Sequence, residues 1–486
     1  MDANTLPLLS IIIFIQLILA PIIYLVTRSS KKFGDILSII TSSIPFIIVS
    51  YFFNIVYNGS AIYEEYPWIP AFNLKIGFLL DQTSYPFALL ISIMGFLSTI
   101  YSTKYMEHEH NYAAYMALLL MFNAGMLGVV LATNLFLLYI FWELMLIPSY
   151  FLIAYWGTGR PRIIGFKYFV FTHAGALAML FGIVWLYVLY GTLEISQLSN
   201  LITNRIENLY IAILIFIGAA VKMAVFPFHT WLPDAHAEAP TPISVLLSGV
   251  MIKTGAYLIV RILLGLFSWT IPLMNIPIVI LALISMIWGG VMALVQVDVK
   301  RVLAYSSISQ VGYILFGLVT LSPIGVAGGI FHVLNHGFAK GLLFMCSGVL
   351  IHVLNERDLN KLGGLASKMP FTATAMLVGG LSIAGTPPLG GFASEWMIFS
   401  GGIDSGLTIY TAVAIANTAI TAGYYLRMIR AVFFLNPKQD LSKVHDASLT
   451  MIVPMSILLF LVIILGFINY PITTIITKSV IQLIKM

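Results

Sequence analysis

Long runs of apolar residues, each about as long as a bilayer is thick, dominate the pattern of this chain. A helix that crosses a membrane needs about 20 such residues. The runs lack the two-residue alternation of barrel strands, so they predict an all-α polytopic membrane protein. We expect about 14 transmembrane helices, near residues 6–26, 36–56, 83–102, 112–131, 135–156, 163–190, 210–228, 244–267, 271–295, 303–321, 325–353, 371–399, 409–434 and 449–470.

The composition supports a membrane protein and excludes several other classes. Of the 486 residues, 60% are hydrophobic and 9% are charged, whereas a soluble domain carries about 25% charged residues. A soluble enzyme and a disordered chain are therefore excluded. The net charge of +5 is scattered between apolar runs, so no nucleic acid is expected as a partner. The single cysteine, Cys346, cannot form an intrachain disulfide or hold a cluster.

Basic residues predict how the chain is oriented. Sixteen Lys and Arg residues lie in or beside connections that follow odd-numbered spans, against three after even-numbered spans. Basic residues concentrate on the cytoplasmic side of membrane proteins. We therefore expect a multi-pass protein of the cell membrane with both termini on the non-cytoplasmic side, and an organellar inner membrane remains an alternative.

Five ionisable residues lie inside predicted spans: Glu143, Lys222, Lys253, Lys340 and Glu395. A charge at the bilayer centre costs at least about 2.5–3.5 kcal/mol on insertion scales. A protein with a purely structural role could carry leucine at these positions. The pattern therefore predicts a path for protons or ions. The alternative is a scaffold in which the charges only hold helices together.

Histidines extend the predicted path. His332, His336 and Lys340 are spaced four residues apart, so they share one face of a helix. Imidazole can accept a proton on one nitrogen and release one from the other. Two histidines at this spacing can also bind a metal, but no cysteine or carboxylate nearby completes a ligand set, so no metal is expected. His173 is as compatible with packing as with proton transfer.

Two short polar segments lie outside the predicted spans. His229, Asp234, His236 and Glu238 fall in a predicted loop after the seventh span. We expect them to order that loop by hydrogen bonds, with a surface proton entry or a metal site as alternatives. Asp298, Lys300 and Arg301 are expected to anchor the chain at the membrane interface or to contact a neighbour.

Helix breakers interrupt two spans at mid-depth. Pro227 lies in the seventh span, and the sequence 385–391 (GTPPLGG) lies in the twelfth, four residues before Glu395. Irregular backbone at membrane depth survives only inside protein or beside water, and paired broken helices are typical of inverted-repeat transporters. We expect two inverted five-helix repeats, spans 4–8 and 9–13. The predicted units are 1–111, 112–267, 271–434 and 449–486.

Two long motifs carry a family resemblance. Residues 229–242 (HTWLPDAHAEAPTP), which lead into 253–257 (KTGAY), and residues 298–313 (DVKRVLAYSSISQVGY) resemble the antiporter-like membrane subunits of proton-pumping quinone oxidoreductases. The resemblance covers the chain from about the third span onward. Within this family the chain resembles the chain M type (subunit 4) of respiratory complex I, since it has Phe141-Trp142-Glu143 in span 5 and Glu395 in span 12.

Other features resemble sister groups. Lys340 is similar to the lysine of the chain N type and of the D-type antiporter protein, and residues 390–396 (GGFASEW) resemble membrane subunits of energy-converting hydrogenases. The resemblance therefore implies a proton-translocating subunit of an NADH:quinone oxidoreductase. A subunit of a multi-subunit Na⁺/H⁺ antiporter and a subunit of an energy-converting hydrogenase or a ferredoxin-linked respiratory complex stay as alternatives.

The implied mechanism moves protons through this chain and leaves electron transfer to others. We expect a Glu143–Lys222 pair at about 4 Å, where the attraction is about 4 kcal/mol at an effective dielectric of 20. The proton would pass from Lys222 to Lys253, through His332, His336 and Lys340, and on to Glu395. No cofactor is expected in this chain. NADH or another donor, flavin, iron–sulfur clusters and quinone would belong to partner subunits, among them sister antiporter-like subunits.

Overall fold

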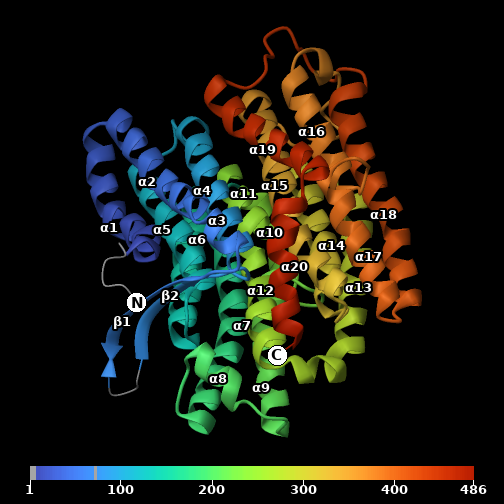
Figure 1. Cartoon of the computed structure of the whole chain (residues 1–486). Coiled ribbons are helices and arrows are strands. Elements are labelled where there is room, and N and C mark those ends of the chain that lie inside the picture. The colour runs from blue at the N-terminus through green and yellow to red at the C-terminus, as the bar shows by residue number, and fades with distance from the viewer. Residues whose placement is uncertain (1–6, 71–73, 486) are drawn as a thin grey trace.

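The computed structural model describes residues 7–70 and 74–485, and its long helices pack side by side in one bundle (Figure 1). Twelve helices in the described residues are long and apolar enough to cross a membrane. They are α1 (Leu8–Ser29), α2 (Lys31–Tyr51) with α3 (Phe53–Tyr57), α4 (Tyr85–Tyr105), α5 (Tyr112–Leu131), α6 (Leu135–Trp156), α7 (Pro161–Tyr190), α9 (Ile206–Met223), Thr241–Leu264, α13 (Ile271–Val295), α14 (Val299–Val319), α15 (Pro323–Leu354) and α19 (Leu449–Phe467).

The two remaining predicted spans are also helical. The span expected at 371–399 corresponds to α16 (Pro370–Ile383) and α17 (Gly390–Asp404). The span expected at 409–434 corresponds to α18 (Thr408–Ile429), which continues into a π-helical turn. Each predicted span thus meets a helix, and the helical membrane fold is confirmed.

The seventh and twelfth predicted spans are both interrupted. Helix α9 ends at Met223, where Ala224 takes a left-handed conformation (φ 59°), and α10 (Trp231–Glu238) follows. Gly385 (φ 68°) lies between α16 and α17. Side chains satisfy backbone groups that the first break frees, since the backbone N–H of Phe226 donates to Ser285 Oγ at 2.9 Å. The breaks are confirmed, but the seventh helix ends five residues earlier than the predicted 228.

The predicted loop after the seventh span is wrong. Asp234, His236 and Glu238 lie in α10, and only His229 lies in the connection before it. Pro233, Pro240 and Pro242 make this segment resemble a loop in the sequence. Pro233, however, falls in the first turn of α10, where a helix does not need the missing N–H.

The eighth span is not a regular helix. A π-helical segment, Leu247–Met251, separates α11 (Thr241–Leu246) from α12 (Ile252–Leu258). A second π-helical segment, Ile259–Leu264, follows α12. Such segments are rare and often lie at functional sites. Nothing in the local sequence indicated them.

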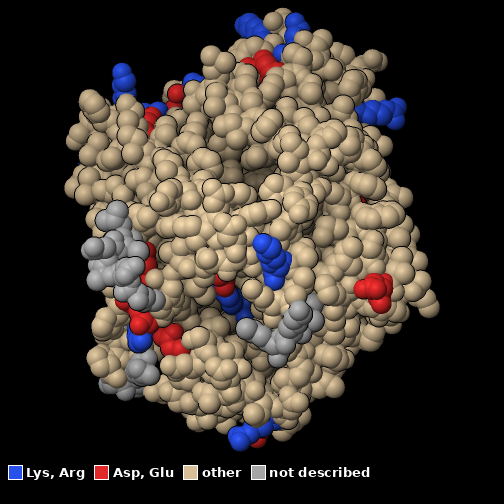
Figure 2. Space-filling model, in the orientation of Figure 1, with Lys and Arg blue, Asp and Glu red and all other residues tan. Residues whose placement is uncertain are grey.

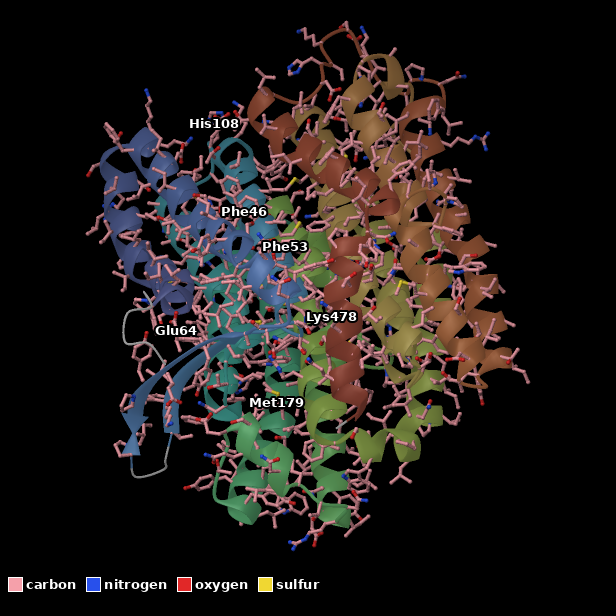
Figure 3. The ribbon with its side chains drawn as sticks, viewed as in Figure 1. Phe46, Phe53, Glu64, His108, Met179 and Lys478 are labelled. Carbon is pink, nitrogen blue, oxygen red and sulfur yellow. The ribbon has the colours of Figure 1, made fainter. Side chains whose placement is uncertain are left out.

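A strand pair corrects the prediction of an all-helical chain. β1 (Ile62–Ile69) pairs antiparallel with β2 (Leu74–Leu80). The carboxylate of Glu64, labelled in Figure 3, accepts hydrogen bonds from the backbone N–H groups of Leu9 and Ser10 at 2.8 and 2.9 Å. A carboxylate is stabilised at the positive end of a helix, so β1 is fixed to the start of α1.

The C-terminal tail forms a helix, α20 (Tyr470–Lys485), that packs along α15. The hydroxyl group of Ser479 also lies 2.7 Å from that of Thr83, in the connection before α4. Lys478, labelled in Figure 3, donates to the backbone oxygen of Tyr57 at 2.9 Å. A short helix, α8 (Ile195–Leu201), lies in the connection between α7 and α9.

The outer surface is largely apolar. Most of the face shown in Figure 2 is uncharged, and its Lys and Arg residues gather mainly at the upper and lower ends. Helices α1, α7 and α19 expose large side chains, such as Ile18, Val188 and Leu449. Helices α14 and α15 lie inside and are almost entirely buried. An apolar surface of this extent requires lipid or neighbouring subunits as cover.

Helices α13 and α14 approach each other closely at a glycine, which generates a stability prediction. A Cβ at Gly312 would lie 2.6 Å from the carbonyl oxygen of Ala282. We expect Gly312→Ala to destabilise the protein by about 1–3 kcal/mol through overpacking, seen as a lower thermal unfolding midpoint in detergent. The matched control is Gly423→Ala in α18, where the nearest atom would be 3.6 Å away. Equal midpoints for both variants would contradict the close approach.

Candidate functional site

The predicted path residues lie inside the helix bundle. Lys222, Lys253, His332, His336, Lys340 and Glu395 are each at most 3% exposed. They come from α9, α12, α15 and α17, which are far apart in the chain. Glu143 on α6 differs, because its side chain is 20% exposed.

Glu143 lies closer to a histidine than to the predicted lysine. Its carboxylate is 3.1 Å from Nδ1 of His173. Lys222 lies over the ring of Trp142, with Nζ 5.2 Å from the ring centroid, and within electrostatic range of Glu143. Among the described residues, Nζ of Lys222 has no hydrogen-bond partner. The expected direct pair at about 4 Å is therefore not formed among the described residues: Oε2 of Glu143 contacts His173, and its Oε1 has no hydrogen-bond partner.

Lys253 donates to a backbone oxygen and not to a carboxylate. Its ammonium group bonds to the carbonyl of Ser248, which lies in the first π-helical segment. The hydroxyl of Ser248 lies 2.7 Å from that of Ser307 on α14. No hydrogen bond connects Lys253 to Lys222 in the described part of the chain.

The two histidines of α15 have different surroundings. Nε2 of His332 lies 2.7 Å from Oε1 of Gln310, and its Nδ1 lies 2.9 Å from the hydroxyl of Ser394. Both ring nitrogens of His336 lack a partner among the described residues. The ring centroids of His332 and His336 are 6.1 Å apart. His336 also lies within electrostatic range of Lys253 and Lys340.

Lys340 is held by neutral oxygen atoms. Its Nζ donates to the backbone oxygen of Leu303 at 2.8 Å and to the hydroxyl of Tyr425 at 3.0 Å, and also to the hydroxyl of Ser306. The predicted spacing thus places His332, His336 and Lys340 on one face of α15, directed at α14 and its neighbours.

Glu395 lies against the second helix break. A Cβ at Gly385 would come within 2.2 Å of Oε2 of Glu395, so the glycine leaves room for the carboxyl group. The other oxygen, Oε1, is buried and has no partner in the described residues. Tyr313 and Tyr424 lie within electrostatic range of it.

Two further residues belong to this interior: the sequence named His236 only for loop-ordering hydrogen bonds, with a surface proton entry or metal site as alternatives, and Lys300 only as an interface anchor or neighbour contact. His236 of α10 is fully buried, and its ring stacks on Phe344 with centroids 5.0 Å apart. Lys300, at the start of α14, is 3% exposed and donates to the backbone oxygen of Ala239. Ala235 and Ala237, which flank His236, are the sequence feature that could have indicated its burial, since alanines suit a tightly packed helix. In the described residues, no three His, Cys, Asp or Glu residues are grouped to hold a metal ion.

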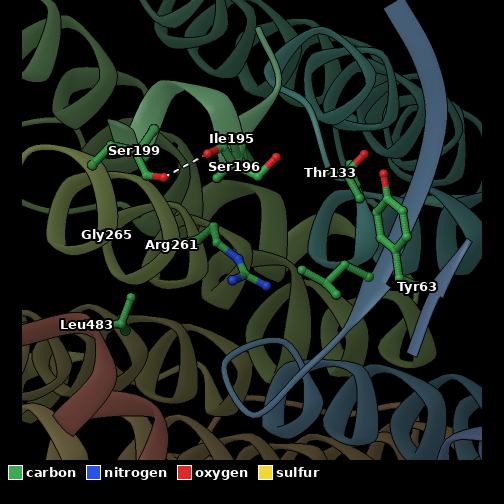
Figure 4. A pocket seen from close by; sticks show the side chains of 11 residues that line it. Tyr63, Thr133, Ile195, Ser196, Ser199, Arg261, Gly265 and Leu483 are labelled. Carbon is green, nitrogen blue, oxygen red and sulfur yellow. Dashed lines mark hydrogen bonds between the residues drawn. The ribbon is translucent and has the colours of Figure 1, made fainter. Parts of the chain in front are cut away.

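A cavity of about 440 Å³ lies at the end of the bundle that carries β1 and α8. Tyr63, Thr133, Ser199 and Arg261 line it, together with apolar side chains (Figure 4). The guanidinium of Arg261 is already engaged, with two bonds of 2.8 Å to the carboxylate of Asp81. Burial disfavours the charge on Asp81, but Arg261 and hydrogen bonds from Ser84 hold the pKa of the carboxyl below its usual value. This pair fixes structure and leaves no free charge for a ligand.

Comparison with known families gives two matches. Residues 132–421 match the family described as "NADH:quinone oxidoreductase/Mrp antiporter, TM". Residues 68–116 match "NADH-Ubiquinone oxidoreductase (complex I), chain 5 N-terminus". The first match covers the two helix breaks and all the path residues.

Curated relatives are antiporter subunits. The chain is 34% identical to Na⁺/H⁺ antiporter subunit A1 of Staphylococcus aureus over 98% of its own length. It is 36% identical to an antiporter subunit of Staphylococcus saprophyticus over 468 residues, 88% of this chain. It spans only 62% and 57% of the lengths of these two relatives.

Solved structures share the fold. A chain of the Mrp complex from Dietzia sp. DQ12-45-1b superposes with a TM-score of 0.90 at 22% identity, covering 99% of this chain and 98% of that one. A chain of respiratory complex I from Thermus thermophilus gives 0.89 at 22% identity, with 98% and 99% covered. A chain of the membrane-bound sulfane sulfur reductase, an archaeal respiratory membrane complex, gives 0.88 at 30% identity, with 94% and 76% covered.

The contact between Gly385 and Glu395 yields a prediction. Gly385→Ala would strain a backbone with positive φ, at about 1–2 kcal/mol, and would also displace the carboxyl group of Glu395. Gly406→Ala is the matched control, because Gly406 has φ 75° but no atom within 4 Å of the added Cβ. We expect Gly385→Ala to lower the thermal unfolding midpoint in detergent more than Gly406→Ala. Equal effects would show that the Glu395 contact is unimportant.

Proposed function

Because the chain belongs to the family of NADH:quinone oxidoreductase/Mrp antiporter membrane subunits, we propose that it is a proton-translocating subunit of a multi-subunit Na⁺/H⁺ antiporter. The observation that carries the proposal is the buried series of lysines and histidines that lies between two broken helices. The antiporter subunits among its curated relatives support this complex over an NADH dehydrogenase.

The hydrogen-bond partners of the lysines suit proton transfer. Lys253 and Lys340 donate to carbonyl and hydroxyl oxygens. Such oxygens accept hydrogen bonds from an ammonium group and from a neutral amine alike, so they do not hold the lysine in one protonation state. A carboxylate partner would favour the charged state strongly. Neutral partners therefore leave each lysine free to gain and lose its proton.

The proposed path retains the predicted residues. The proton passes from Lys222 to Lys253, then through the His332, His336 and Lys340 group to Glu395. His336 lies within electrostatic range of both Lys253 and Lys340, which supports its place between them. Water bridges the step from Lys222 to Lys253. Spans 4–8 and 9–13 are proposed to be two inverted repeats, each with one broken helix.

A second candidate is a subunit of a respiratory membrane complex. The 30% identity to the sulfane sulfur reductase chain favours this candidate. The present chain also spans 76% of that chain, against 62% of the Staphylococcus aureus antiporter subunit. In such a complex, flavin, iron–sulfur clusters, quinone or an electron donor such as NADH would lie in partner subunits. The chain M type of complex I has weaker support, because the similarity to complex I is 22% and reaches only the fold.

Removal of the Lys222 amine, in the first proposed repeat (spans 4–8), tests proton translocation. We expect Lys222→Ala to reduce proton transport at least tenfold in vesicles that contain the assembled complex, because the path loses one of its buried amines. The readout is the quenching of a pH-sensitive dye. Lys438→Ala is the control, because Lys438 is exposed and donates only to the backbone of Asn360 at 2.9 Å. Full transport by Lys222→Ala in an intact complex would refute the proposal.

Identification of the partners separates the two candidates. We expect a tagged chain, extracted in mild detergent, to bring along small hydrophobic antiporter subunits without iron–sulfur proteins, as found by mass spectrometry. Recovery of iron–sulfur subunits would instead establish the respiratory complex. Sodium-dependent proton movement in the same vesicles provides an independent check.

A further inference from the structure

A second cavity opens at the other end of the bundle. Its volume is about 310 Å³, and it is formed where several helices end or begin: after α4, α6 and α10, at the start of α14, and after α15. This is the end at which Figure 3 labels His108, in the turn after α4. The positive-inside pattern predicts that it faces the cytoplasm. The residues that line it are Tyr105, Met106, Glu109, Trp156, Thr158, Ala239, Pro240, Lys300, Ile351, Asn355, Glu356 and Arg357.

The cavity has acidic groups in its wall and a buried amine. The carboxylates of Glu109 and Glu356 are 50% and 22% exposed, so bulk water reaches them. Lys300 also lines the cavity but is only 3% exposed. A carboxylate near an opening attracts protons, and a buried amine can receive them.

His236 lies beyond Lys300 in the interior. Lys300 donates to the backbone oxygen of Ala239, three residues after His236 in the chain. The imidazole is fully buried, and neither ring nitrogen has a partner in the described residues. The positive charges of Lys300, Lys253 and Lys340 all act on this ring. The ring is thus within electrostatic range of the amine at the cavity and of two amines of the proposed path.

We propose that this cavity is the proton entry of the chain, and that Lys300 and His236 carry the proton from it to Lys253 and Lys340. The inference rests on the proposed function, because it requires that protons move through the chain. It assigns a role in transfer to two residues that the sequence placed at the surface.

Each step conserves protons. The neutral amine of Lys300 takes a proton from water in the cavity and becomes an ammonium group. It returns to the amine by passing a proton to one nitrogen of His236. The imidazolium then releases the proton on its other nitrogen toward Lys253 or Lys340. No oxidant, reductant or metal is required.

A purely structural role would predict a different outcome on mutation. Lys300 and Arg357 both donate to carbonyl oxygens near the end of α10, those of Ala239 and Ala237. Cations stabilise the carbonyl end of a helix. If Lys300 served only this purpose, arginine would replace it, because a guanidinium is also a cationic donor. Arginine does not release its proton in proteins, so it cannot relay one.

The decisive variant is therefore Lys300→Arg in the assembled complex, with proton transport measured in vesicles. The adjacent cavity gives the larger side chain room. We expect transport to fall at least tenfold while assembly and the thermal midpoint stay unchanged. Arg301→Gln is the neighbouring control, since the Arg301 guanidinium pairs with Asp234 at 3.1 Å, outside the residues that line the cavity. Normal transport by Lys300→Arg would assign Lys300 a structural role and overturn the proposal.

His236→Gln keeps a polar side chain without a group that accepts a proton, and we expect the same tenfold loss. Lys222→Ala is measured in parallel. Proton transport by the wild type, loss in Lys222→Ala and normal transport in His236→Gln would refute the entry path alone. A wild type that moves no protons would refute the proposed function itself.

Thiol labelling tests the cavity without disturbing either residue. Cys346 is the single cysteine and is buried in α15, so Cys346→Ser gives a background without thiols. Thr158→Cys then places a thiol at the cavity, and Ser199→Cys places one at the opposite cavity. We expect a cationic, membrane-impermeant methanethiosulfonate, added from the predicted cytoplasmic side, to label Thr158→Cys and reduce transport at least fivefold, without labelling Ser199→Cys. Failure to label Thr158→Cys, or unchanged transport after labelling, would overturn the proposal.

Discussion

The constraint on which this structure depends is the cost of taking lysine side chains out of water. An unpaired buried charge is very unfavourable, and a buried carboxylate partner often recovers little net stability. Lys253, Lys300 and Lys340 each donate to a backbone carbonyl oxygen instead. Regular helices use most of their carbonyl groups internally. The π-helical segment around Ser248 and the end of α10 supply acceptors to Lys253 and Lys300 where the backbone departs from regular geometry. Lys340 differs, because its acceptor Leu303 lies within the regular helix α14.

The same constraint separates residues that hold the fold from residues that are free to exchange protons. Arg261 and Asp81 form two short bonds, which fix their charges and join β2 to the eighth span. His336 and His236 lack partners for their ring nitrogens in the described residues. His332 differs from them, because both of its ring nitrogens have partners, Gln310 and Ser394. Buried imidazoles without partners thus lie in the interior, where the proton path is proposed, whereas the paired charges of Arg261 and Asp81 lie near one end of the bundle.

The sequence predicted the features that depend on long or local signals. Runs of about 20 apolar residues gave the spans, and Pro227 and residues 385–391 gave both breaks, because proline and glycine act locally. The strand pair was missed because both strands lie in the connection between the second and third predicted spans, outside the long apolar runs. The π-helical turns and the burial of His236 and Lys300 were missed because tertiary packing determines them. A helix of eight residues that folds back into the bundle carries no periodic signal of its own.

The position of Glu143 bears on why this chain needs neighbours. Its carboxylate and the ring of His173 are 20% and 35% exposed, on helices whose outer faces carry apolar side chains such as Phe151 and Val170. Polar groups cannot face lipid at that depth without a large cost. In the proposed complex, a neighbouring subunit that covers this pair would remove the cost. Glu143 lies within electrostatic range of Lys222, so the proposed proton path comes nearest to such a neighbour at this pair.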